Sequence, residues 1–174
     1  MKKILFVITL GLAFMGMTSC LSESTEDKYK DWRNANNEWL KKQTTLLDED
    51  GKLFYTSVVA PWDPNATVLI HWFNDRNETK DLLSPIYSST VDVKYIGRIY
   101  TGEAFDSSYV YTSPADSVAR INIYECIEGW GIALPQMHCG DSCRVVVDYP
   151  RLTAPTQRAI TSSPTVCWSL TLSW

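Results

Sequence analysis

The clearest pattern in the chain is a strict alternation of apolar and polar side chains over residues 91–95. A period of two residues is typical of a half-buried β-strand. The apolar side chains that share one side are Val91, Val93 and Tyr95. We therefore expect a strand here, a second strand over residues 98–100, and a turn at Thr101 and Gly102.

Similar patterns predict further strands and two helices. β-Branched and aromatic residues favour strands at residues 53–60, 67–73, 118–124 and 142–149. Apolar residues at three- and four-residue spacing predict helices at 27–47 and 127–137. Loops are expected at Pro61, at Asp63-Pro64-Asn65, and over the polar residues 74–84. Together these elements predict an α+β fold.

The helix predicted over residues 27–47 carries an aromatic stripe that includes Trp32, Trp39 and Leu40. Such a stripe can bind a partner or dimerise, which would make the protein a scaffold. A stripe of this kind more often packs on its own domain, and we expect that arrangement here.

The composition suits one domain with a packed core and excludes some partners. The chain has 174 residues, of which 45% are hydrophobic, which is enough for a single core. Its net charge of −4 argues against a nucleic-acid partner held through phosphate contacts.

The first residues are typical of a targeting segment. Lys2 and Lys3 precede an apolar run, residues 4–17, that is too short for a stable membrane helix. The run ends in small residues followed by Cys20, as in a bacterial lipoprotein. We expect Cys20 to be lipidated and to anchor the chain in the cell envelope, on the periplasmic or outer-membrane face. The alternative is an ordinary signal peptide with an incidental cysteine.

Two cysteines beside a histidine raise the question of a metal site. Cys139 and Cys143 lie four residues apart next to His138. A structural zinc ion needs four ligands, and the sequence offers no evident fourth. We expect no metal, and we expect a turn whose thiols are free or bridged.

Two sequence blocks resemble the signature of FKBP-type peptidyl-prolyl cis-trans isomerases. The first runs from Val91 through Tyr95 and Gly97 to Phe105-Asp106-Ser107-Ser108. The second is Cys126-Ile127-Glu128-Gly129-Trp130, followed by Ala133-Leu134, Met137 and Gly140-Asp141. The resemblance implies an antiparallel curved sheet wrapped around a short helix. It also implies an isomerase that needs no cofactor and acts on proline-containing segments of exported proteins.

The same resemblance implies the site residues. Trp130 would form the floor on which the proline ring packs, and Tyr95 and Phe105 would form walls. Asp106 would shape the side that receives the carbonyl, and Ile127 would offer a wall and a backbone N–H. Ile121 and Ala119 would contribute to substrate binding, as would Cys126, which stands where the family usually has valine.

The chain also departs from the family. Ser117, Val118 and Ala119 lie near positions where the family places two phenylalanines. After Tyr149 the expected Ala-Tyr-Gly and the last strand with its phenylalanine are missing. Plausible codons for residues 151–154 and 163–174 spell both motifs in a shifted frame, so we hypothesise a reading-frame change near residues 149–151. The alternative is a divergent tail whose alternating residues 166–174 form a closing strand.

These observations predict a signal peptide over residues 1–19, a tether and helix over 20–50, and an FKBP-like domain over 51–174. The main functional prediction is a prolyl isomerase. The alternative is an FKBP-like binding or chaperone module with weak activity.

Overall fold

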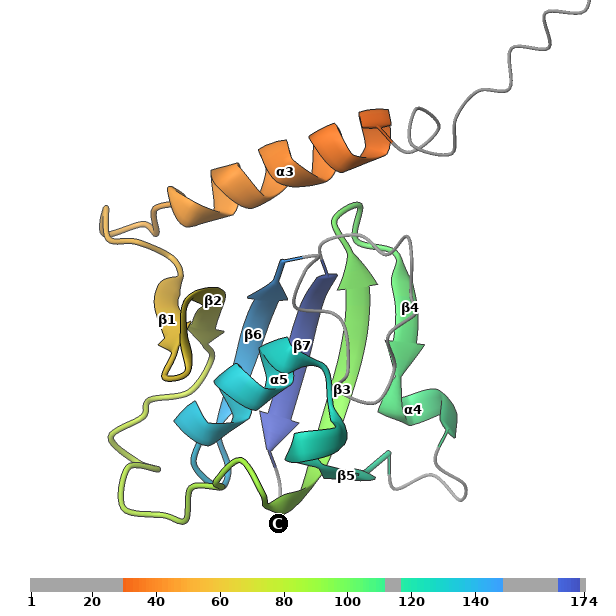
Figure 1. Cartoon of the computed structure of the whole chain (residues 1–174). Helices are drawn as coiled ribbons and strands as arrows, with labels where there is room; N and C mark the ends of the chain where they lie inside the picture. The colour runs from red at the N-terminus through yellow and green to blue at the C-terminus, as the bar shows by residue number, and fades with distance from the viewer. Residues whose placement is uncertain (1–29, 112–116, 149–165, 173–174) are drawn as a thin grey trace, which may run out of the picture. The chain divides into compact units, whose positions relative to one another are not determined.

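The computed structural model describes residues 30–111, 117–148 and 166–172 (Figure 1). For residues 110–111 and 166–172 it describes the backbone alone. The predicted signal peptide and Cys20 lie outside the described residues, as does the point of the hypothesised frame change. The chain from Trp32 onward belongs to one compact unit. No helix among the described residues is both long enough and apolar enough to cross a membrane.

A seven-stranded antiparallel sheet organises the described residues. Its strands are β1 (Thr56–Ala60), β2 (Asp63–Trp72), β3 (Thr90–Ile99), β4 (Ala104–Ser107), β5 (Ala119–Asn122), β6 (Ser142–Val147) and β7 (Val166–Leu172). They lie in the order β1-β2-β6-β7-β3-β4, and β5 also pairs with β3. The predicted closing strand is therefore present as β7, in the middle of the sheet rather than at its edge.

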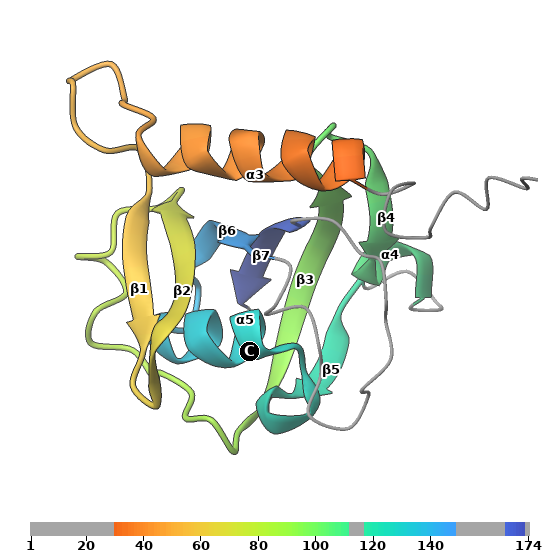
Figure 2. The same ribbon diagram turned by 45° about the horizontal axis from the view of Figure 1, so that its top comes forward.

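Strand β3 is longer than the sequence pattern predicted. We expected two strands, at residues 91–95 and 98–100, but the structure has one strand from Thr90 to Ile99. The pairing register with β4 shifts between Gly97 and Arg98, so the chain accommodates the irregularity by a bulge instead of ending the strand. One edge of β3 pairs with β7, and the other pairs with β5 and then with β4 (Figure 2).

The hairpin between β1 and β2 is tighter than predicted. We expected Asp63-Pro64-Asn65 to form a loop, but β2 begins at Asp63, and the turn is made by Pro61 and Trp62. Pro64 is the second residue of its strand, close to the end where a missing backbone donor is tolerated best. The polar residues 74–84 form neither helix nor strand, as predicted.

The helices are α3 (Lys30–Thr44), α4 (Ser108–Tyr111) and α5 (Glu128–Ala133), with 3-10 turns η1 (Ile123–Glu125) and η2 (Leu134–Gln136). The helix predicted over 127–137 is thus α5 followed by η2, and the end of the strand predicted over 118–124 is η1. The helix predicted over 27–47 corresponds to α3, which ends at Thr44, three residues earlier than predicted.

The two faces of the sheet carry different helices because neighbouring strand residues point to opposite sides. Val68 and Ile70 of β2 pack in one buried cluster with Trp130 and Leu134, and α5 lies across this face (Figure 1). Leu69, between them, belongs to a second cluster. Trp39 and Leu40 of α3 pack against that cluster. The aromatic stripe therefore packs on its own domain, as expected.

Candidate functional site

Tyr95, Asp106 and Trp130 come together in space. The ring centroids of Tyr95 and Trp130 are 5.0 Å apart, in an edge-to-face arrangement with an interplanar angle of 78°. The Tyr95 hydroxyl donates a hydrogen bond to Asp106 Oδ2 at 3.3 Å. Tyr95 therefore joins the predicted floor of the site to the predicted carboxylate. These residues come from β3, β4 and α5, which are separated in sequence.

Local hydrogen bonds orient the carboxylate of Asp106. Its Oδ1 accepts from the backbone N–H of Ser107 at 2.8 Å, while Oδ2 accepts from Tyr95. The side chain is half-buried, so a charged carboxylate here keeps contact with water as well as with these donors. Phe105 alternates with Asp106 along β4, and its side chain is 49% exposed. The structure thus places the ring of Phe105 at a rim rather than inside a closed wall.

Ser108 belongs to the first of the two sequence blocks, and no role was predicted for it. Its side chain is 1% exposed. Ser108 Oγ accepts from the backbone N–H of Tyr95 at 3.0 Å and lies 3.4 Å from the Tyr95 carbonyl oxygen. Ser107 has a different partner, because its Oγ accepts from the backbone N–H of Tyr109 in the first turn of α4. The two serines therefore fix β3 and α4 respectively.

The start of α5 supplies the next part of the site. Ile127 precedes the helix with extended backbone angles, φ −59° and ψ 149°. Its carbonyl accepts from the N–H groups of Trp130 and Gly131, whereas its own N–H makes no hydrogen bond within the described residues. A backbone donor at this position is available to a carbonyl group, as helix starts commonly are.

Cys126 stands beside Ile127 and is partly buried. Its thiol donates to the carbonyl of Asn122 at 3.2 Å. Burial, followed by the nearby charge of Glu125, raises the pKa of the Cys126 thiol to about 11. The side chain is therefore a neutral thiol at physiological pH, and it behaves as a small apolar wall much like the valine it replaces.

The remaining predicted residues lie on β5. Ala119 pairs with Val93 and Ile121 pairs with Val91. Both side chains are partly buried and pack against the same core as Tyr95, Cys126 and Ile127. The structure thus packs these residues against the core that contains Trp130, while their contacts with a substrate stay a prediction.

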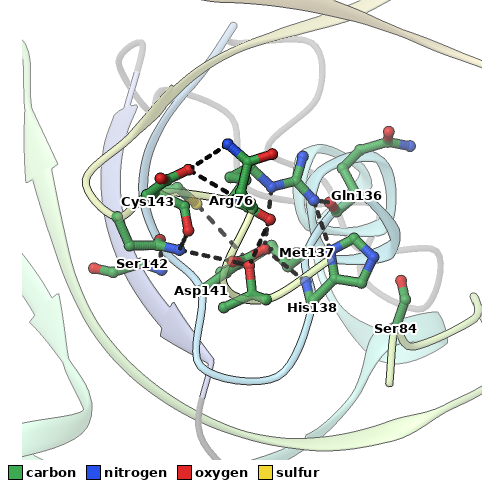
Figure 3. A network of polar contacts seen from close by, with 12 residues as sticks. Arg76, Ser84, Gln136, Met137, His138, Asp141, Ser142 and Cys143 are labelled. Carbon is green, nitrogen blue, oxygen red and sulfur yellow. Dashed lines mark hydrogen bonds and ion pairs between the residues drawn. The ribbon is translucent and has the colours of Figure 1, made fainter. Parts of the chain in front are cut away.

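A second polar cluster holds the turn after η2 (Figure 3). Asp141 is fully buried, and its carboxylate accepts from Thr79 Oγ1 at 2.5 Å, from Asn74 Nδ2 at 3.0 Å and from the His138 backbone N–H at 2.7 Å. Arg76 Nε lies 3.3 Å from Asp141 Oδ2. Burial raises the pKa of Asp141, but these hydrogen bonds together with the Arg76 charge bring it below its ordinary value.

This cluster gives a structural role to His138, which the sequence analysis considered as a candidate metal ligand. Arg76 Nη2 donates to His138 Nδ1 at 2.8 Å and to the Gln136 carbonyl at 2.7 Å. Because arginine has donors only, His138 Nδ1 acts as the acceptor. His138 therefore anchors the loop over residues 74–84. Gly140-Asp141 was recognised as a motif, but Asn74 and Thr79, which donate to Asp141, lie 67 and 62 residues away, too far to be predicted from spacing.

Cys126, Cys139 and Cys143 form no disulfide with one another, and Cys143 donates to the Met137 sulfur at 3.7 Å. No group of three or more metal-ligating side chains occurs within the described ranges. Burial raises the pKa of the Cys143 thiol to about 12.

Comparison with known proteins places the site in a recognised fold. Residues 84–163 match the family model of FKBP-type peptidyl-prolyl cis-trans isomerases. The chain is 28% identical over 71 residues to FK506-binding protein 1 of Saccharomyces cerevisiae and 31% identical over 65 residues to that of Kluyveromyces lactis. These matches span 41% and 37% of this chain, and 60% and 55% of the two relatives.

Solved structures agree on the fold. FkpA from Escherichia coli aligns with a TM-score of 0.60 at 18% identity, covering 86% of this chain and 63% of that one. A peptidyl-prolyl cis-trans isomerase from Pseudomonas syringae aligns with a TM-score of 0.53 at 16% identity, covering 83% and 92%. Wheat FKBP73 aligns with a TM-score of 0.52 at 19% identity, covering 68% and 49%. The predicted FKBP-like α+β fold is confirmed, and the match to the FKBP-type family model spans residues 84–163.

Proposed function

We propose that the FKBP-type domain of this protein catalyses the cis–trans isomerisation of prolyl peptide bonds. The observation that supports this most directly is the position of Tyr95, whose ring contacts Trp130 while its hydroxyl binds Asp106. An apolar ring surface for proline and a polar edge for the amide thus lie on either side of one residue.

The reaction needs a site that favours a twisted amide. Rotation about a peptide bond costs about 18–20 kcal/mol because the C–N bond has double-bond character. Twisting the bond removes this resonance and makes the amide less polar. A partly dry surface that fits the twisted form better than the planar one lowers the barrier without covalent chemistry. Trp130, 5% exposed and packed in the core, is a rigid base for such a surface.

Each remaining residue has a role that follows from its position. The Ile127 N–H, which is not used within the described residues, would bind a substrate carbonyl. Asp106, with Tyr95 and Ser107 as donors, would provide the polar edge. Phe105, at the rim, would close over the proline when a substrate is bound. Cys126, Ile121 and Ala119 would provide apolar contacts.

A proline-peptide isomerisation assay tests this proposal. Asp106→Asn keeps the shape of the side chain and removes its charge, and Trp130→Leu keeps an apolar core residue and removes the indole surface. We expect each to lower kcat/KM by at least about tenfold, equivalent to about 1.4 kcal/mol of transition-state stabilisation. Asp81→Asn, at an exposed acid of the 74–84 loop, is the matched control. An inactive wild-type protein, or full activity in both site variants, would refute the proposal.

A binding or chaperone module with weak activity is the second candidate. It is favoured by Ala119, which presents a small side chain on β5 near a position where the family has phenylalanine. A thinner wall would hold a proline less tightly. If the wild-type domain binds unfolded chains but does not accelerate isomerisation, this second function is the correct one.

Repeating the assay with the frame-corrected tail, and reading the coding DNA, tests the frame-change hypothesis.

We further propose that the protein acts in the cell envelope on exported proteins, held there by a lipid on Cys20. The charged start, the apolar run and the cysteine after small residues support this proposal. Cys20→Ser should abolish incorporation of labelled fatty acid and release the protein from the membrane fraction. Labelling that persists in this variant, or a membrane location that does not change, would contradict lipidation at this residue.

A further inference from the structure

A hollow beside α5 and η2 is lined by none of the residues assigned to the proposed reaction. Its volume is about 380 Å³, within the usual range for ligand sites. Three prolines (Pro61, Pro85 and Pro135) line it together with Trp62 and Tyr87. Trp62 comes from the β1–β2 turn, Tyr87 from the segment before β3, and Pro135 from η2, so at least three separate segments build it.

Aromatic rings continue outward from this hollow in an exposed row. Trp62 is 51% exposed, Tyr87 is 38% exposed and Tyr124 is 54% exposed. The centroids of Trp62 and Tyr87 are 5.4 Å apart, and those of Tyr87 and Tyr124 are 5.6 Å apart. Within the described residues, the hydroxyls of Tyr87 and Tyr124 make no hydrogen bond, so both can donate to a ligand. Exposed apolar rows of this kind usually mark interaction sites.

A carboxylate lies beside one ring of the row. Trp62 Nε1 donates to Glu128 Oε1 at 3.3 Å, so a carboxylate lies directly beside the indole. Asp63 follows Trp62 in the chain, and Glu125 follows Tyr124. None of the described residues that line the hollow is a lysine or arginine. A cation on a ligand would meet both the Glu128 carboxylate and the faces of the rings.

The surface is held in place before any ligand binds. Ser84 Oγ donates to the Pro135 carbonyl at 3.2 Å. Ser89 bonds twice with Ile86, and its carbonyl accepts from the Ile123 N–H. These contacts fix the segment that carries Tyr87 to η2 and η1. Preorganisation reduces the entropy lost on binding.

We propose that the surface formed by Trp62, Tyr87, Tyr124 and Glu128, with the three prolines behind it, binds an extended proline-rich segment that carries a basic residue. Aromatic-lined grooves take polyproline II segments because this conformation is preformed and offers regular ridges and free carbonyls. Two neighbouring ring pairs suit the prolines, the tyrosine hydroxyls suit the carbonyls, and Glu128 suits a lysine or arginine. The surface shares no residue with the proposed isomerase site.

The test is fluorescence anisotropy with the full chain and a short labelled peptide of the form Pro-x-x-Pro-x-Arg. We expect saturable binding that weakens with added salt. Trp62→Ala should weaken binding about tenfold or more, as is typical for an aromatic anchor. Glu128→Gln should weaken binding of this peptide but not of the same peptide with glutamine in place of arginine. Tyr109→Ala, at an exposed tyrosine on α4 (56%), is the control and should bind normally.

A second variant keeps the test valid if Trp62→Ala alters the hairpin. An added Cβ at Gly131 would lie 2.7 Å from Tyr87 Cε2, so Gly131→Ala should displace that ring and also weaken binding. Three results would overturn the proposal: no binding by the wild type, equal binding of a peptide whose prolines are alanines, or loss of binding in Asp106→Asn, which would place the peptide in the isomerase site. Sedimentation that shows a dimer dissociated by Trp62→Ala would also overturn it, in favour of a second copy as the occupant.

Discussion

The buried hydroxyl of Ser108 holds the backbone of Tyr95, with its Oγ 3.0 Å from the Tyr95 nitrogen and 3.4 Å from the Tyr95 carbonyl oxygen. Tyr95 lies on β3 and Ser108 at the start of α4. Because Tyr95 contacts both Trp130 and Asp106, this buried hydroxyl sets the position of the residue around which the site is built.

The Ser108→Ala substitution should therefore lower the activity of the site by more than the accompanying loss of stability would explain. Leaving the Tyr95 N–H without its acceptor costs about 1–3 kcal/mol in free energy of unfolding. We also expect a fall in kcat with little change in KM, because the peptide surface remains but its geometry loosens. Ser108→Thr, which keeps the hydroxyl, should restore part of kcat. Ser107→Ala, which loses only the contact with Tyr109, is the matched control; an equal kcat defect there would contradict the role given to Ser108.

Gly129 allows α5 to approach β6 closely. A Cβ at this position would lie 2.6 Å from Val147 Cγ2, closer than real atoms approach. Gly129→Ala should destabilise the protein by about 1–3 kcal/mol, the usual cost of overpacking. The double variant Gly129→Ala/Val147→Ala should lose less stability than the sum of the single variants, as measured by urea unfolding. Strict additivity would show that the two residues do not compete for the same space.

The carboxylate of Asp141 holds the loop over residues 74–84 to the turn after η2. Asp141→Asn keeps the shape but places an amide where Thr79, Asn74 and the His138 N–H all donate. Breaking a buried charged network by removing one partner typically costs about 3–5 kcal/mol. Thermal and urea unfolding should show a loss of this size, whereas Asp81→Asn on the same loop should change stability by no more than about 0.5 kcal/mol. A loss below 1 kcal/mol for Asp141→Asn would mean that the network is not formed in solution.

The same carboxylate predicts a dependence of stability on pH. The pKa of Asp141 in the folded protein lies below its ordinary value of 3.8. The unfolded chain therefore takes up the proton first as the pH falls, so the stability contributed by Asp141 is complete above about pH 4–5 and is lost below it. The difference in unfolding free energy between the wild type and Asp141→Asn should be constant near neutrality and shrink as the pH falls from 4 towards 3. A difference that grew over that range would have the wrong sign.

Two thiols should resist alkylation in the folded protein. The pKa values of Cys126 and Cys143 are raised to about 11 and about 12, mainly by burial, and only the thiolate reacts. Iodoacetamide at pH 8, followed by peptide mass spectrometry, should modify both at least tenfold more slowly in native protein than in urea. Rapid modification of Cys126 without unfolding would show that the wall beside Ile127 opens readily.

Sequence reasoning located the elements and the motif residues because those signals are local. Any fold that buries one face of a strand or helix produces such signals, here the alternation of Val91, Val93 and Tyr95 and the spacing around Trp130. The FKBP-like α+β architecture was expected because two sequence blocks resemble that family. The bounds of β3 and of the β1–β2 hairpin were wrong, because Gly97 and Pro64 read as breakers unless the neighbouring strands are known.

What the chain order could not reveal is which distant groups meet. Three contacts illustrate this: Ser108 with Tyr95, Arg76 with Asp141, and Trp62 with Glu128. Each contact joins segments that the packing of the sheet and α5 brings together, and no local sequence pattern encodes such pairs. The sequence by itself determined where apolar faces and ring-bearing residues occur, since these follow from periodicity. The tertiary structure alone decided which polar atoms share a buried space, since that depends on how separate strands and helices fit together.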